Sequence, residues 1–148
     1  MISNAASLKG SVAVDVEAGH NRLVSLYRDM GYEVMQGRDL DRRGMRQVLT
    51  EFSQEVEDGD GKIVVHFSGR AVTIGSETLL VPVGMNATDR TGVIFAAVPL
   101  TAVLSTAQAR EGDTAIILAL NAEEDPDFAA FATRPFKVDA PEDALVVY

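Results

Sequence analysis

Two nearly unbroken apolar runs constrain the fold more than any other feature of the sequence. Residues 63–67 read IVVHF and follow the turn-forming sequence DGDG, and residues 114–120 read TAIILAL. A strand with one face in solvent alternates apolar and polar residues, whereas a continuously apolar strand is typical of a parallel sheet that is buried on both faces. The two runs therefore predict a mostly parallel sheet with helices on both sides.

Segments with helical periodicity separate the strand candidates. Apolar residues recur every three or four positions after Asp15 and again after Asp41, and each aspartate is a suitable N-cap. Leu40 precedes the second cap in the position of a hydrophobic staple. We therefore expect helices over 15–30, 41–56 and 100–109, and short strands over 32–35, 78–83 and from 145 onward.

Strands that alternate with helices in a chain of 148 residues predict one α/β domain over residues 1–148. The expected architecture is a three-layer sandwich in which helices flank a mostly parallel sheet. Ligand sites in such folds lie at the carboxyl ends of strands. The segments 67–71 and 120–125 are therefore the candidate site.

Composition excludes several classes of function. The sequence has 22 acidic and 13 basic residues, a net charge of −9, which argues against nucleic acid or an anionic membrane as partner. It has no cysteine and only two histidines, so we expect no disulfide, no zinc site and no cofactor. No apolar run is long enough to cross a membrane and the start lacks an export signal, so we expect a cytoplasmic location, or a periplasmic one if the chain is truncated.

Four segments resemble the caspase-like cysteine peptidases, and in particular their bacterial metacaspase and orthocaspase branch. LKGSVAVDVEAGHNRLVSLYRDMGYEV and DLDRRGMRQVLTEF resemble the first two helices of that family. KIVVHFSGRAVTIGSETLLVPV is similar to its apolar strand, Ser-Gly-His-Gly motif, hairpin and LxPVD motif. GDTAIILALNAEEDPDF is similar to the strand that normally ends in Asp-Ala-Cys-Arg. The resemblance covers nearly the whole chain and implies a caspase-like fold, shortened at both ends.

The same resemblance implies that the catalytic dyad of the family is lost. The histidine position falls on Arg70 and the cysteine position on Ala122, give or take one residue, while the aspartate of LxPVD falls on Gly84. Alanine cannot attack a carbonyl, and an arginine, with a pKa above about 12, cannot act as a base near neutral pH. The chain is thus expected to be a pseudoenzyme without catalytic residues. The former cleft is expected to comprise Ser68, Gly69, Arg70, Asn121, Ala122 and Glu123.

The sequence leaves open what Arg70 does in that cleft. It could pair with Glu123 or Glu124 across the cleft, extend into solvent, or bind an anion. Ser68 lies two residues from His66, but the sequence HFSGR lacks the glycine spacing of a nucleophile elbow. Strand alternation instead predicts that His66 is a packed core residue, and His20 is expected on an exposed or lightly packed helix face.

Three classes of function remain. The leading expectation is a non-catalytic module for binding, scaffolding or regulation, whose protein partner is an active caspase-like peptidase or a second copy of the chain. The second is a hydrolase that uses residues outside the family pattern, and the third is a structural domain of a longer protein. Because only MISN remains of the first strand of the family, we expect residues 2–5 or 11–14 to fill that place in the sheet.

Overall fold

The computed structural model describes residues 1–4, 11–58, 62–86, 89–107, 114–121, 128–130, 132 and 144–147. The strands are β1 (Ile2–Ser3), β2 (Gly37–Arg38), β3 (Ile63–Ile74), β4 (Glu77–Leu80), β5 (Val98–Pro99), β6 (Thr114–Asn121) and β7 (Ala144–Val147). The helices are α1 (Ser11–Asp29), α2 (Arg42–Asp58), α3 (Arg90–Ala96) and α4 (Leu100–Ala107). No helix within these ranges is long and apolar enough to cross a membrane.

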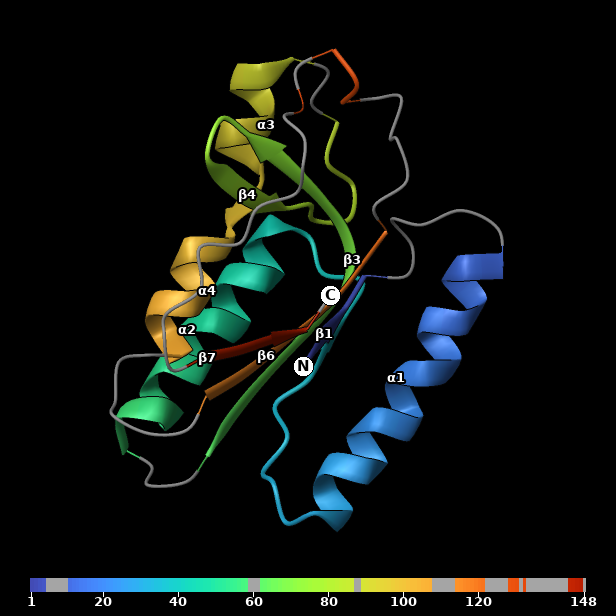
Figure 1. Cartoon of the computed structure of the whole chain (residues 1–148), viewed down its shortest axis with the longest axis vertical. Helices are drawn as coiled ribbons and strands as arrows, with labels where there is room; N and C mark the ends of the chain where they lie inside the picture. Colours follow the sequence, from blue (N-terminus) through green and yellow to red (C-terminus); the bar gives the residue numbers. More distant parts are fainter. Residues whose placement is uncertain are drawn as a thin grey trace.

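The centre of the structure is a parallel sheet of β2, β1, β3, β6 and β7 in that order. The second half of β3 leaves this sheet and forms an antiparallel hairpin with β4, which in turn pairs with β5. α1 covers one face of the sheet, and α2 and α4 cover the other (Figure 1). The predicted three-layer α/β fold with a mostly parallel sheet is therefore confirmed.

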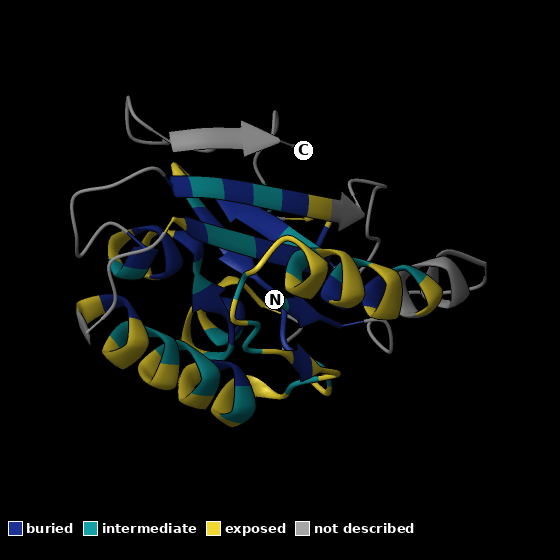
Figure 2. Cartoon of the chain, turned by 90° about the horizontal axis from the view of Figure 1, so that it is seen from below, coloured by how far each residue is buried: buried dark blue, intermediate teal, exposed yellow. Residues whose placement is uncertain are grey.

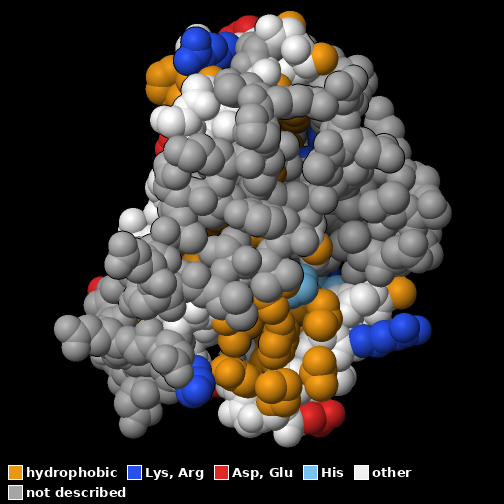
Figure 3. Space-filling view, in the orientation of Figure 1, with side chains coloured by type: hydrophobic (Ala, Val, Ile, Leu, Met, Phe, Trp, Pro, Cys, Tyr) orange, Lys and Arg blue, Asp and Glu red, His pale blue; other side chains and the backbone are white. Residues whose placement is uncertain are grey.

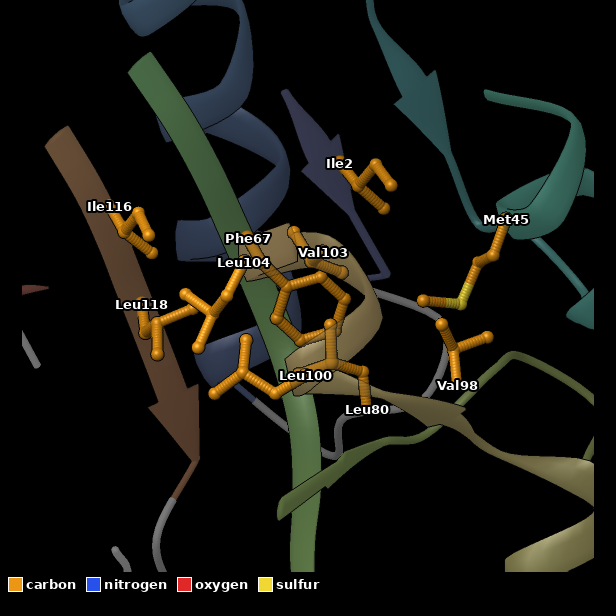
Figure 4. Packing of buried hydrophobic residues seen from close by; sticks show 10 residues of the cluster. All are labelled: Ile2, Met45, Phe67, Leu80, Val98, Leu100, Val103, Leu104, Ile116 and Leu118. Carbon is orange, nitrogen blue, oxygen red and sulfur yellow. The ribbon is translucent and has the colours of Figure 1, made fainter. Parts of the chain in front are cut away.

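The main core lies between the sheet and the pair α2 and α4, with Phe67 at its centre (Figure 4). It is formed by Ile2, Met45, Phe67, Leu80, Val98, Leu100, Val103, Leu104, Ile116 and Leu118. A second cluster lies around the hairpin and α3, and consists of Val72, Ile74, Leu79, Val81, Val93, Ala97 and Phe128. Both clusters include residues of β3 and β4, and residues 68–70 of β3 lie between Phe67 of the main core and Val72 of the second cluster.

The expected burial of both faces is only partly found on β6. Ile116 and Leu118 are buried on the side of α2 and α4, whereas Ile117 is half-buried and Ala119 is exposed on the opposite side. The burial pattern in Figure 2 follows this alternation along β6. Among the described helices only α1 lies on this side, and it packs beside β1. The apolar run thus predicted the strand correctly, but it overestimated how far the second face of β6 is buried.

The short strands and the helix ends differ from the sequence expectations. The expected strand over 32–35 is wrong, because the parallel pairing with Ile2 and Ser3 falls on Gly37 and Arg38. The helix expected from Asp15 begins four residues earlier, so Asp15 is not its N-cap, and residues 11–14 are helical. Ile2 and Ser3 fill the place of the first strand, in register with Phe67 and Ser68.

Other boundaries agree more closely. Asp41 caps α2 as predicted, with its Oδ1 accepting a hydrogen bond from the backbone N–H of Gly44 at 2.7 Å. The strand expected over 78–83 is β4 and ends at Leu80, two residues before Pro82. The helix α3 and the strand β5 were not predicted, because seven and two residues are too few for a clear period.

Candidate functional site

The end of β6 lies beside Gly69 and Arg70 of β3, where the parallel pairing of the two strands stops. The strand end predicted over 67–71 is wrong, because β3 continues to Ile74 and pairs with β4 from Ala71 onward. In the parallel pairing of the two strands, Gly69 is in register with Leu120 and Arg70 with Asn121. The strand pairing thus places Ser68, Gly69 and Arg70 beside the segment that ends at Asn121, and their membership of a former cleft stays a prediction. Ala122 and Glu123 lie outside the described residues, as does the expected contact of Arg70 with Glu123 or Glu124.

Arg70 is held against an aromatic ring. Its guanidinium carbon lies 4.9 Å from the centroid of the Phe128 ring, a cation–π distance. Phe128 is buried in the second cluster, and the backbone oxygen of Arg70 accepts a hydrogen bond from the N–H of Val81 at 3.0 Å. The alternative of an arginine that only extends into solvent is therefore wrong. Arg70 thus links β3, at the point where it leaves the parallel sheet, to a residue that follows β6 in the chain.

His66 and Ser68 form a buried hydrogen-bonded pair on β3. The distance between His66 Nε2 and Ser68 Oγ is 3.0 Å, and each residue is 6% exposed. The prediction of a packed core histidine is confirmed. Burial lowers the pKa of His66 to about 4, so the ring is neutral at pH 7. Within the described residues the other ring nitrogen, Nδ1, has no hydrogen-bond partner, so no described carboxylate orients the imidazole.

The buried His66 predicts a loss of stability in acid. Because its pKa is about 4 in the folded protein and about 6.5 in the unfolded chain, the unfolded chain binds more protons between these values. The free energy of unfolding should therefore fall as the pH drops from 7 towards 4, by on the order of 2–3 kcal/mol from this residue. Urea unfolding at a series of pH values measures this loss. The matched variant His66→Gln keeps a polar group near Ser68 but does not titrate, and an unchanged pH profile in that variant would contradict the assignment.

His20 is buried, contrary to the expectation of an exposed or lightly packed face. It is 1% exposed on the inner side of α1, and its Nε2 lies 3.2 Å from Oε1 of Gln36. Burial lowers its pKa, and a charge on it would also oppose protonation of His66. His20 precedes Leu23 and Val24 by three and four positions, so its helical spacing could have predicted this burial. Figure 3 shows hydrophobic side chains gathered between α1 and the sheet, with a histidine beside them.

Asn4 organises the backbone around the strand ends and was not singled out from the sequence. It is fully buried, and its backbone N–H donates to the oxygen of Ser68 at 2.8 Å. Its Oδ1 accepts from the N–H of Leu40 at 3.0 Å, and its Nδ2 lies 3.4 Å from the oxygens of Leu40 and Val81. One side chain thus joins β1, the start of α2 and the segment after β4. The resemblance of MISN to the first strand of the family was the one sequence feature that could have drawn attention to Asn4.

Two glycines of the site region have structural roles. A Cβ on Gly69 would lie 3.0 Å from Cζ of Phe67 and 3.3 Å from Cβ of Asn4, so the close packing of these side chains disfavours any larger residue. Gly84, where the family has an aspartate, adopts a φ of 74°, which is unfavourable for most other residues. Across the described segments, no three histidine or carboxylate side chains lie close enough to hold a metal ion.

Comparison with known proteins agrees with this geometry. A family model described as the caspase domain matches residues 3–148. The chain belongs to the caspase-domain family. No curated protein matches the sequence significantly. The caspase-domain match extends over both strand ends, and the assignment of Arg70 and Ala122 to the lost dyad stays a prediction from the resemblance of their flanking motifs.

Proposed function

We propose that this caspase-domain protein lacks peptidase activity and serves as a binding, scaffolding or regulatory module. The observation that carries the proposal is the position of Arg70, where β3 leaves the parallel sheet next to the end of β6, with its guanidinium over Phe128. A cation packed against a ring in the place of the family histidine cannot accept the proton of a nucleophile. The absence of cysteine from the sequence supports the same conclusion.

The proposed partner is another protein. An active caspase-like peptidase of the metacaspase or orthocaspase branch, or a second copy of this chain, would suit a domain that keeps the fold and has lost the dyad. The net charge of −9 disfavours nucleic acid and anionic membranes. Light scattering of the purified protein, alone and mixed with such a peptidase, measures self-association and complex formation. A monomer that changes neither the mass nor the activity of the peptidase would count against this assignment of the partner.

The absence of peptidase activity is tested with a panel of fluorogenic peptides that carry basic or acidic residues at the cleaved position. We expect no turnover above that of buffer, and no difference between the wild-type protein and Arg70→Ala. Turnover that survives repurification and is abolished by Arg70→Ala would overturn the proposal. Loss of turnover without loss of fold, checked by circular dichroism, would then assign Arg70 to the chemistry.

A hydrolase that uses Ser68 and His66 is a second candidate, because their side chains are at hydrogen-bond distance. Three observations oppose it: both residues are buried, the low pKa of His66 makes it a weak base, and no described carboxylate orients its ring. Ester substrates smaller than a peptide test this candidate most directly. Hydrolysis that is lost in Ser68→Ala and retained in the exposed control Ser25→Ala would favour it over the inactive module.

A further inference from the structure

A pocket of about 550 Å³ lies between the start of α2 and the segment that follows β4. Arg42, Arg43 and Arg46 line it from α2, and residues 82–86 line it from the other side. Among the described residues, its lining includes neither Ser68 nor Arg70 of the expected former cleft. Its volume is within the range of about 300–1,000 Å³ that is typical of small-molecule sites.

The three arginines outnumber the carboxylates among the described lining residues, so this part of the pocket carries a net positive charge. All three are exposed, and within the described residues their guanidinium groups form no hydrogen bond or ion pair. The one carboxylate among the lining residues, Asp41, already accepts the N–H of Gly44. This bond occupies one N–H group at the start of α2, and the three guanidinium groups add charged donors to the pocket lining. Three cations in one pocket are notable in a protein of net charge −9.

The walls of the pocket are anchored to the core. The N–H of Val83 donates to the oxygen of Leu40 at 2.9 Å, which joins the loop to the start of α2. Met45, which lies between Arg43 and Arg46 in the sequence, is fully buried. It packs in the main core and so fixes this turn of α2 to the sheet. Met85 packs against the second cluster, and Ala96 comes from α3. The arginines therefore lie on a helix that is packed against the core, and the wall of the pocket that faces them is partly apolar.

We propose that this pocket binds a small organic anion that combines a phosphate or carboxylate group with an apolar body. Guanidinium groups bind both oxyanions through paired N–H donors, and Arg42 and Arg46, four residues apart on α2, lie on the same side of the helix. Pro82, Val83 and Met85 provide the apolar contact for the body of the ligand. This site does not depend on whether the chain has lost peptidase activity.

Titration of the protein with phenyl phosphate, benzoate and benzyl alcohol in a phosphate-free buffer, followed by calorimetry or NMR, tests the proposal. We expect saturable binding of at least one of the two anions, and weaker or no binding of the neutral alcohol. Arg46→Ala and Arg42→Ala should each weaken anion binding about 10-fold or more, as expected for the loss of a charge-assisted hydrogen bond. The control Arg22→Ala, which removes an exposed arginine of α1 outside the pocket, should leave the affinity unchanged.

The relative affinity of the two anions identifies the group that is recognised, phosphate or carboxylate. Three outcomes would overturn the proposal: neither anion binds saturably, the alcohol binds as well as the anions, or binding weakens equally in Arg22→Ala and Arg46→Ala. Thermal unfolding of each variant shows whether the fold is kept. Because all three arginines are exposed, we expect the variants to unfold at nearly the wild-type temperature.

Discussion

We expect Asn4→Ala to lower the free energy of unfolding by about 3 kcal/mol, as measured by urea unfolding. The substitution removes the acceptor of the Leu40 N–H and the donor to the oxygen of buried Val81, and it leaves a small cavity. Each buried polar group that loses its partner costs about 1–3 kcal/mol. A loss of this size from one polar side chain would identify Asn4 as the main connection between β1, α2 and the end of β4.

Two further variants make the Asn4 prediction specific. Asn4→Asp keeps the acceptor for the Leu40 N–H but places a carboxylate near the oxygens of Leu40 and Val81, so it should destabilise the protein more than Asn4→Ala. Asn21→Ala removes an exposed asparagine of α1 whose Oδ1 accepts a hydrogen bond from the Arg38 guanidinium. Because water can replace this exposed bond, the stability should change by no more than about 0.5 kcal/mol. A loss below about 1 kcal/mol in Asn4→Ala would contradict the proposed role of Asn4.

The second large effect is expected at Phe128. Phe128→Ala should lower the free energy of unfolding by about 3–4 kcal/mol, because it removes a buried ring from the second cluster. The matched control is Phe95→Ala, since Phe95 is 69% exposed and its truncation should have an effect near zero. Equal losses in both variants would show that Phe128 is not packed as described.

A double-mutant cycle with Arg70→Ala tests the cation–π contact itself. We expect a coupling of about 0.5–2 kcal/mol between Arg70 and Phe128, as is typical of such contacts when they are partly desolvated. Additive losses would mean that the guanidinium contributes nothing through the ring. A measured coupling would assign Arg70 a role in holding the chain after β6 against β3, and would support the reading of the site as structural.

The sequence predicted the parallel sheet and the pairing of its two main strands because both follow from long apolar runs, but it placed the end of β3 too early. Such runs define β3 and β6, and the carboxyl ends of adjacent parallel strands meet at one edge. The N-cap at Asp41 was likewise predictable from residues that are close in the chain. The two-residue strand β2 was not predictable, because its existence depends on pairing with Ile2 and Ser3 at the other end of a long helix. The strand β1 was expected only from the family resemblance, as one of two alternatives.

The same distinction applies to the candidate site. The chain by itself determined that no thiol is present, that an arginine follows Ser68 and Gly69, and that these motifs follow the two apolar runs. Only the tertiary structure decided that Arg70 packs on Phe128, that Nε2 of the buried His66 lies at hydrogen-bond distance from Ser68 Oγ, and that His20 is buried. It also decided that the arginines of α2 face the loop after β4. Strand and helix patterns are properties of neighbouring residues, whereas side-chain contacts depend on how distant elements pack, which local periodicity does not encode.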